Sequence, residues 1–318
     1  MSALAAPTTR KLTLAEQRRA YISEGALGCF SAASDQVITV GRVAIAPARG
    51  GKMTRSLAIV VAGFCIAGFA AAAELEPAPA GIDAKEVVNR AEAAMRGDRT
   101  YCKCEMTVSS PRLASDRKVV FESWTDGPGE RSFIRIHEPA KDSGAGFLKL
   151  HPNLWMYVPR VERTIRVPPS MMLQSWMGSD FSNDDLVRES SEVEDYDHIL
   201  LGVDPGSEAS GGRRSYVVEY RPHEDAPVVW GRIVAWIDAE LWTPLFQEFY
   251  DEEGEKIREM RFSEVREVDG RNVPHRWALT PLDKPGHKTD VVVHEIRYDL
   301  EIDDSVFTTR NLKRGRRQ

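Results

Sequence analysis

Apolar and polar residues alternate along most of the chain from Tyr101 onward, and this period of two is typical of half-buried β-strands. In the stretch 215–221, Tyr216, Val218 and Tyr220 share one face, while polar side chains share the other. Turn signals such as Asp-Gly separate several of the runs. Strands are predicted from Tyr101 and at Lys118–Trp124, Arg131–His137, Gly146–Leu150, Leu154–Val158, Thr164–Val167, Tyr196–Leu201, Ser215–Arg221, Arg232–Asp238, Leu245–Asp251, Glu259–Val265, Val273–Thr280 and Thr289–Tyr298.

One amphipathic helix is expected at Asp83–Arg96. Val87 and Ala91 lie on one stripe at helical spacing, and Asp83 with Glu86 resembles a capping box at the start. Roughly a dozen strands with short connections and few helices indicate a mainly β fold. The sheet is expected to be antiparallel, because βαβ units would require a helix between successive strands.

Two of the predicted strands, Arg232–Asp238 and Leu245–Asp251, are apolar on both faces. Strands of this kind are covered on both sides. We therefore expect one side of the sheet to face a helix or lid there and the other side to face a neighbouring layer.

Residues 53–73 have the layout of a secretory signal peptide. A basic residue precedes an apolar run from Leu57 to Ala70, and further alanines lead to acidic Glu74. The run is short for a membrane span, which needs about 20 apolar residues. The alternative is an uncleaved inner-membrane anchor.

The signal is preceded by residues 1–52, although signal peptides lie at N-termini. We expect Met53 to be the true start and residues 1–52 to be a non-native or disordered extension; a cytoplasmic tail before a membrane anchor is the alternative. A linker rich in proline and alanine then covers residues 74–82. The folded domain is expected at residues 83–312, and residues 313–318 form a basic tail.

The charge of the chain argues against nucleic-acid binding. Of its 42 lysines and arginines and 48 aspartates and glutamates, eight and three lie in residues 1–73. The remaining 34 basic and 45 acidic residues give a net charge of −11. A nucleic-acid-binding protein would instead present a basic face.

Cys102 and Cys104 are the cysteines that follow the signal. Residues i and i+2 of a strand point to the same face, with Cα atoms about 6.5 Å apart, which is near the upper limit for a disulfide. A strained bridge and two free neighbouring thiols both remain open. Zinc is not expected, because a second pair of ligands is lacking.

Motifs of catalysis are missing from the sequence. It contains no G-x-S-x-G, no H-E-x-x-H and no phosphate-cradling glycine loop, and none of its seven histidines lies four residues from another. The acidic residues Asp180, Asp184 and Asp185 could coordinate a divalent ion, but Ser-Asp and Asn-Asp pairs are typical of turns and helix N-caps. We interpret this cluster as structural, and expect neither catalysis nor a cofactor or metal.

Leu154–Ser191 combines two tryptophans, four methionines and a paired proline with many charged residues. Methionine is flexible and polarizable, so a wall rich in methionine can repack around different apolar ligands. The segment therefore indicates a surface that binds a hydrophobic ligand, the alternative being that these side chains fill a core. The expected binding residues are Met171, Met172, Leu173, Trp176 and Met177 in a movable flap, and Trp155 and Tyr157 on the cavity wall.

The run WMYVPRVERTIRVPPSMMLQSWMGSDFSNDDLVRES, together with Trp230-Gly231 and the stretch GHKT at 286–289, resembles the outer membrane lipoprotein-sorting proteins. These are relatives of the periplasmic carrier LolA, and the resemblance covers about Asp83 to Leu312. It implies a strongly curved, incomplete antiparallel β-barrel, with a helical lid across its open mouth and an apolar cavity between barrel and lid.

The resemblance also implies a non-catalytic periplasmic carrier, which binds acyl chains of a lipoprotein or lipid and passes them across the envelope. Its partners would be an inner-membrane exporter of the resistance-nodulation-division (RND) type and an outer-membrane acceptor. Arg160, Arg163 and Arg166 lie near the Met/Trp segment and are equal candidates for the arginine that controls release in the carrier. The alternative function is a sensor of lipids or lipoproteins in envelope stress, either periplasmic or tethered to the inner membrane.

Overall fold

The alternating runs form one antiparallel sheet of 13 strands in the computed structural model. The structure describes residues 75–127, 130–187, 192–224, 226 and 228–314, all within the unit Ala73–Gln318. The expected extension and signal peptide, residues 1–73, lie outside the described residues. Within the described part of the chain, no helix has the length and apolar character needed to cross a membrane.

Every run predicted as a strand corresponds to a strand of the sheet. The strands are β1 (Arg99–Ser109), β2 (Arg117–Asp126), β3 (Arg131–Glu138), β4 (Gly146–Leu150), β5 (Asn153–Val158), β6 (Arg163–Arg166), β7 (Tyr196–Asp204), β8 (Ser215–Pro222), β9 (Arg232–Asp238), β10 (Pro244–Tyr250), β11 (Lys256–Val268), β12 (Arg271–Pro281) and β13 (Lys288–Tyr298). The helices are α2 (Ala84–Met95), α3 (Asn183–Val187) and α4 (Thr309–Leu312), with 3-10 turns η1 (Pro159–Val161), η2 (Pro169–Met171) and η3 (Asp304–Phe307).

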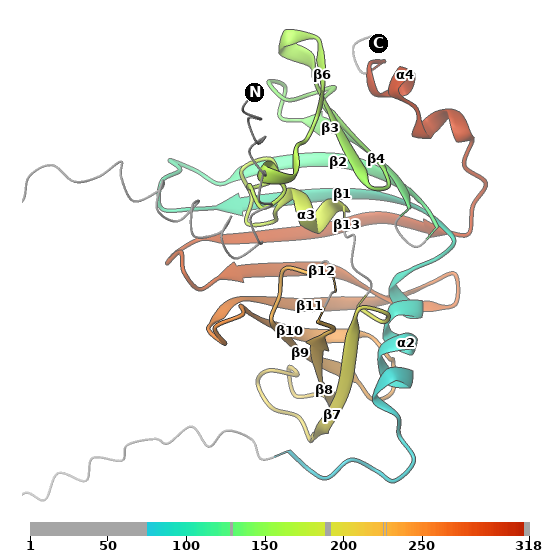
Figure 1. The fold of residues 1–318 in the computed structure, drawn as a ribbon, viewed down its shortest axis with the longest axis vertical. Coiled ribbons are helices and arrows are strands. Elements are labelled where there is room, and N and C mark those ends of the chain that lie inside the picture. Colours follow the sequence, from blue (N-terminus) through green and yellow to red (C-terminus); the bar gives the residue numbers. More distant parts are fainter. Residues whose placement is uncertain (1–74, 128–129, 188–191, 225, 227, 315–318) are drawn as a thin grey trace, which may run out of the picture. The chain divides into compact units, whose positions relative to one another are not determined.

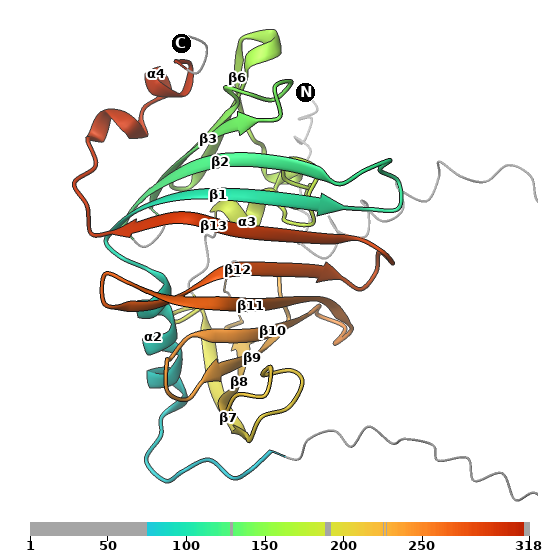
Figure 2. The ribbon, with the colours of Figure 1, turned by 180° about the vertical axis from the view of Figure 1, so that it is seen from behind.

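The strand order makes β6 and β7 the two edges of the sheet. The order is β6-β5-β4-β3-β2-β1-β13-β12-β11-β10-β9-β8-β7, so β1 pairs with β13 in the middle. The sheet is curved and not closed into a barrel (Figure 1). The chain between β6 and β7 must therefore return from one edge to the other, and α3 on this connection lies on the concave side, behind the strands in the reverse view (Figure 2).

Helix α2 covers the concave side of the half of the sheet that contains β7, β8 and β12. Asp83 caps its N-terminus by accepting a hydrogen bond of 3.1 Å from a backbone N–H of the first turn. Val87 and Val88 are buried in a cluster with Tyr220 and Leu279. The face that the helical spacing predicts is therefore the one that packs on the sheet.

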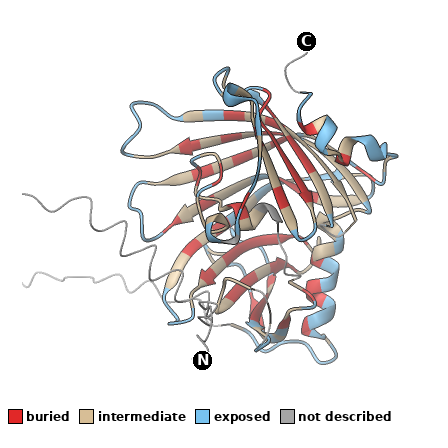
Figure 3. Ribbon diagram, turned by 45° about the horizontal axis from the view of Figure 1, so that its top comes forward, coloured by how far each residue is buried: buried red, intermediate tan, exposed pale blue. Residues whose placement is uncertain are grey.

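Alternate residues of one strand pack into separate hydrophobic clusters on opposite faces of the sheet. On β4, Phe147 points to the concave side and joins the cluster beneath the β6–β7 connection, whereas Leu148 points to the convex side. There it packs with Phe307 and Leu312 from the C-terminal helices. Figure 3 shows buried and less buried positions interleaved along the strands. Neither η3 nor α4 was predicted, because four residues are too few for a periodic pattern.

The strands with two apolar faces are buried on both sides, as their sequence predicts. On β9, Ile233 and Val234 point to opposite faces, yet are only 2% and 6% exposed. In the expected linker, Glu76 forms an isolated antiparallel bridge with Val203 at the β7 edge, with N–H···O distances of 2.8 and 2.9 Å.

Candidate functional site

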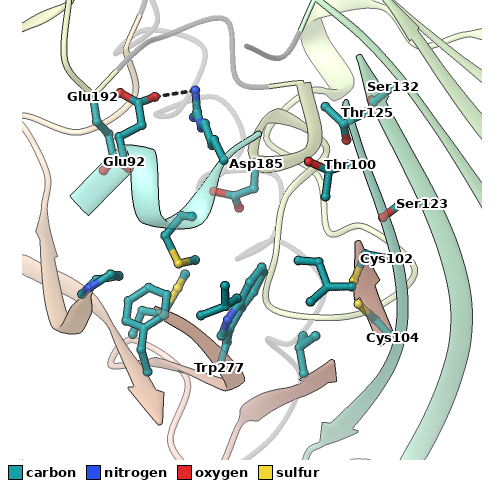
Figure 4. Close-up of a pocket in the computed structure, with 18 of the residues that line it drawn as sticks. Glu92, Thr100, Cys102, Cys104, Ser123, Thr125, Ser132, Asp185, Glu192 and Trp277 are labelled. Carbon is teal, nitrogen blue, oxygen red and sulfur yellow. Dashed lines mark ion pairs between the residues drawn. The ribbon is translucent and has the colours of Figure 1, made fainter. Parts of the chain in front are cut away.

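A cavity of about 410 Å³ lies between the concave side of the sheet, α2 and the connection from β6 to β7. This volume is within the range of about 300–1,000 Å³ that is typical of small-molecule sites. We call residues 168–187 of the connection the lid segment. Figure 4 shows Thr100, Cys102 and Cys104 of β1 on one side of the cavity and Glu92 of α2 on the other.

The inner part of the cavity is apolar. Its lining side chains come from strands on both sides of the β1–β13 pair, among them Met106, Ile134, Met260 and Val291. Trp176 and Phe181 of the lid segment complete the lining. An enclosure of this kind offers dispersion contacts to a hydrocarbon chain and few hydrogen-bond partners to a polar ligand.

Trp176 fixes the lid segment to the sheet. Its ring meets Phe121 and Phe147 edge-on, with centroids 5.4 and 5.7 Å apart, and it is only 3% exposed. The backbone N–H of Trp176 donates a hydrogen bond of 2.7 Å to the carbonyl of Phe181, which closes a tight loop. Gly178 stands in this loop at φ +74°, a conformation that favours glycine.

Two further contacts tie the same loop to strands. Nη1 of Arg117 on β2 donates a hydrogen bond of 2.6 Å to the carbonyl of Met177. The hydroxyl of Thr289 on β13 donates to the Asp180 carboxylate at 2.8 Å and accepts the Asp180 backbone N–H at 3.0 Å. The carboxylate of Asp180 therefore serves as an anchor for the lid segment.

A buried ion pair anchors the end of the lid segment. The Arg258 guanidinium on β11 donates two hydrogen bonds, of 3.0 and 2.8 Å, to the two carboxylate oxygens of Asp185 on α3. It also lies over the rings of Trp230 and Phe249, at 4.3 and 4.5 Å from their centroids. Since both charged side chains are largely buried, loss of one partner would leave the other in a poorly solvated place.

Most of the predicted flap residues, which belong to the lid segment, pack together against the concave side of the sheet. Trp176 lines the cavity, and Met171, Met172 and Met177 are partly buried against the apolar cluster on the concave side. Leu173 is half-buried. Of the predicted flap residues, Trp176 lines the cavity, and a movable flap at these positions stays a prediction.

Trp155 and Tyr157 lie on the other face of the sheet. Their neighbours Leu154 and Met156 belong to the concave cluster, so alternation along β5 directs the two aromatic side chains to the convex side. There they pack in the cluster that contains Phe307 of η3. The two residues therefore do not form the cavity wall that the sequence predicts, and residues of β1, β2 and β3 line the cavity instead.

Arg160, Arg163 and Arg166 are exposed on η1 and β6, at the edge of the sheet. The arginines that contact the lid segment are instead Arg117 and Arg258. Sequence reasoning missed both, because they lie 60 and 73 residues from their partners along the chain.

Cys102 and Cys104 are both free and both line the cavity. The neighbouring Cys102 thiol, together with burial, raises the pKa of Cys104. The sequence left open a strained disulfide or two free thiols, and the structure contains two free thiols.

One polar cluster has the composition of a catalytic triad. Ser110 Oγ lies 3.0 Å from His287 Nε2, and His287 Nδ1 lies 3.5 Å from the Asp180 carboxylate. The second distance exceeds that of a hydrogen bond, and Asp180 already bonds to Thr289. Ser110 and His287 are not among the residues that line the cavity. We therefore interpret the cluster as part of the attachment of the lid segment to β13.

A family model that is described as an uncharacterized protein matches residues 129–314, which is more than half of the chain. The chain belongs to that family. A comparison with curated proteins gives no match.

Three solved structures share the fold of this chain, and two of them are described as lipoprotein-sorting or LolA superfamily proteins. A DUF1329 family protein from Desulfovibrio piger is 22% identical, with a TM-score of 0.65, over 72% of this chain and 97% of that one. An outer membrane lipoprotein-sorting protein domain from Vibrio parahaemolyticus is 22% identical, with a TM-score of 0.62, over 73% and 98%. A LolA superfamily protein from Nitrosomonas europaea is 20% identical, with a TM-score of 0.60, over 72% and 99%. The LolA-like fold expected from the sequence is thus confirmed.

Proposed function

We propose that this protein is a non-catalytic carrier, which binds the acyl chains of a lipoprotein or lipid in the cavity and passes them across the cell envelope. The observation that supports the proposal is the cavity of about 410 Å³ with its apolar inner wall. The lid segment above it is held to the strands by side-chain hydrogen bonds from Arg117 and Arg258. The similarity in fold to an outer membrane lipoprotein-sorting protein domain points to the same class of cargo.

The energetics of an acyl chain suit a carrier. Burial of each methylene contributes about 0.8 kcal/mol, so a chain of about 14 carbons gains roughly 10 kcal/mol. Loss of translational freedom and ordering of the chain offset much of this gain. Binding in the micromolar range or tighter is then expected, which is strong enough for transport and weak enough for release. Apolar contacts also tolerate chains of different lengths.

The proposal places the protein in the periplasm, delivered there by the signal at residues 53–73. An inner-membrane exporter of the RND type would load the cargo and an outer-membrane acceptor would receive it. Support for these partners comes from the sequence resemblance at residues 155–190. The carrier would act without chemistry on its cargo, since the Ser110–His287 pair lies outside the cavity lining.

Removal of two lid side chains tests the proposal. Trp176→Ala combined with Met172→Ala should weaken uptake of a fluorescent fatty acid about tenfold or more, because a buried aromatic side chain contributes about 2–3 kcal/mol of apolar contact. Trp155→Ala is the matched control, since it removes a tryptophan from the opposite face of the same sheet. Unchanged uptake by a folded double variant would contradict the proposed binding site.

A further inference from the structure

The polar side chains of the cavity include a row that crosses four neighbouring strands. Thr100 of β1 is paired with Thr125 of β2, Thr125 with Ser132 of β3, and Ser132 with Lys149 of β4. All four line the cavity. We call them the polar row. Since neighbouring strands lie about 4.8 Å apart, the polar row spans about 14 Å.

Polarity falls from this row toward the interior. The next inward row along the same strands is Cys102, Ser123 and Ile134, and the one after it begins with Cys104 and Phe121. Figure 4 shows Thr100, Thr125, Ser123 and Ser132 gathered along one side, with the two cysteines further along it. The cavity therefore has a polar end and an apolar end, and this distribution of polarity matches that of an amphiphile.

The hydroxyl groups of the polar row face the cavity without protein partners in the described part of the chain. Thr100, Thr125 and Ser132 are half-buried, and their side chains make no hydrogen bond with another described residue. Hydroxyl groups that are accessible in this way can hydrogen-bond to water or to a ligand. A ligand oxygen at this end of the cavity would supply one.

Lys149 contributes the charge of the polar row. Its side chain is only 3% exposed, although it stands on a strand that is otherwise apolar on this face. Because an ammonium has three donors, Lys149 can bind a ligand oxygen in addition to its contacts within the protein.

We propose that the polar row binds the anionic headgroup of the cargo, a carboxylate or a phosphate, while the acyl chain extends toward Cys104 and Met106. The inference rests on the proposed carrier function and names the chemical class of its cargo. The other side of the cavity carries the ion pair between Glu92 and Arg96, in which the two charges compensate each other (Figure 4). Lys149 and the hydroxyls thus set the orientation in which an amphiphile enters.

The test compares three ligands that share one sixteen-carbon chain. Hexadecanoate carries a carboxylate, hexadecyl phosphate carries a phosphate, and hexadecan-1-ol is neutral. Their affinities are measured by displacement of a neutral apolar fluorophore from the full protein. Loss of a hydrogen bond to a charged group typically weakens binding about 10- to 100-fold. Lys149→Met should therefore reduce affinity for both anions by that factor and leave the alcohol unchanged.

Two variants and a control make the result interpretable. Lys149→Arg keeps the charge and should retain most of the affinity for the anions, and Thr125→Val should lower that affinity about threefold to tenfold. Lys103→Met removes an exposed lysine from the convex face of β1 and should change nothing.

The outcomes separate the two proposals. Stronger binding of hexadecanoate than of hexadecyl phosphate, or the reverse, identifies the headgroup. If all three ligands bind wild-type protein equally, and Lys149→Met and Thr125→Val bind them as wild type does, the headgroup site is wrong while the carrier function stands. If none of the three binds, the carrier function itself is contradicted.

Discussion

Asp238 holds the end of β9 to the turn that follows it. Its carboxylate is fully buried and accepts hydrogen bonds from the backbone N–H groups of Glu240 and Leu241, at 2.9 and 2.8 Å, and from the guanidinium of Arg213. Burial alone would raise the pKa of Asp238. The hydrogen bonds to Arg213 and to the backbone outweigh burial and lower the pKa below its usual value.

This lowered pKa predicts how stability depends on pH. The stabilising contribution of Asp238 is present above the unfolded pKa of about 3.9 and is lost as the pH falls through the lower folded pKa. Asp238→Asn should reduce the free energy of unfolding by about 1–2 kcal/mol at pH 7, because hydrogen bonds to a charged group are lost. The difference from wild type should shrink below about pH 4. Urea denaturation at several pH values measures both effects.

Asp283→Asn is the control for this prediction, since Asp283 is an exposed aspartate. It should leave the free energy of unfolding unchanged at every pH. An Asp238→Asn difference that stays constant from pH 7 to pH 3 would show that the carboxylate charge is not the cause.

The strands were predictable from the sequence, but their faces were not. A period of two assigns alternate residues to opposite sides without saying which side is concave. On β5 both sides are apolar, and Trp155 and Tyr157 turn outward because η3 and α4 cover the convex face. That cover comes from residues more than 140 positions later, and no pattern within β5 indicates it.

The apolar character of the lid segment was predictable from its composition, but the contacts that attach it to the strands were not. Its methionines and Trp176 mark it as an apolar flap, and in the structure they pack against the apolar cluster on the concave side of the sheet. The polar row was missed because its members are single residues on four strands, which only the register of the sheet brings together. Arg258 was missed because its partner Asp185 lies 73 residues away along the chain.

The ion pair between Arg258 and Asp185 should control how firmly the lid segment is held. Arg258→Met leaves a carboxylate in a largely buried place, which typically costs about 3–5 kcal/mol. We expect a loss of that order in the free energy of unfolding, and faster amide hydrogen exchange in residues 168–187 than in the strands. Denaturation and mass-spectrometric exchange measure the two effects.

Arg261→Met is the matched control on the same strand. Arg261 is exposed and contacts the carbonyls of Glu208 and Ala209 rather than the lid segment. Exchange in residues 168–187 should then equal that of wild type. Equal exchange in the Arg258→Met and Arg261→Met variants would mean that the ion pair does not hold the lid segment.

The whole molecule is organised by one topological constraint. Because β6 and β7 form opposite edges of a curved, unclosed sheet, the chain between them must return from one edge to the other, and it does so on the concave side. Helix α2 covers one half of that side and the lid segment covers the other. The space left between them is the cavity, which is apolar inside and polar at one end. This geometry supports the proposed carriage of an amphiphile.

Native mass spectrometry of the protein purified from its own cell envelope would show directly whether the cavity holds an acyl chain. We predict a mass increase that corresponds to one lipid per protein, which organic extraction removes and added hexadecanoate partly restores. The Met172→Ala and Trp176→Ala double variant should carry less lipid than wild type. A folded protein that arrives without lipid, and acquires none from an extract of the same envelope, would contradict the carrier function.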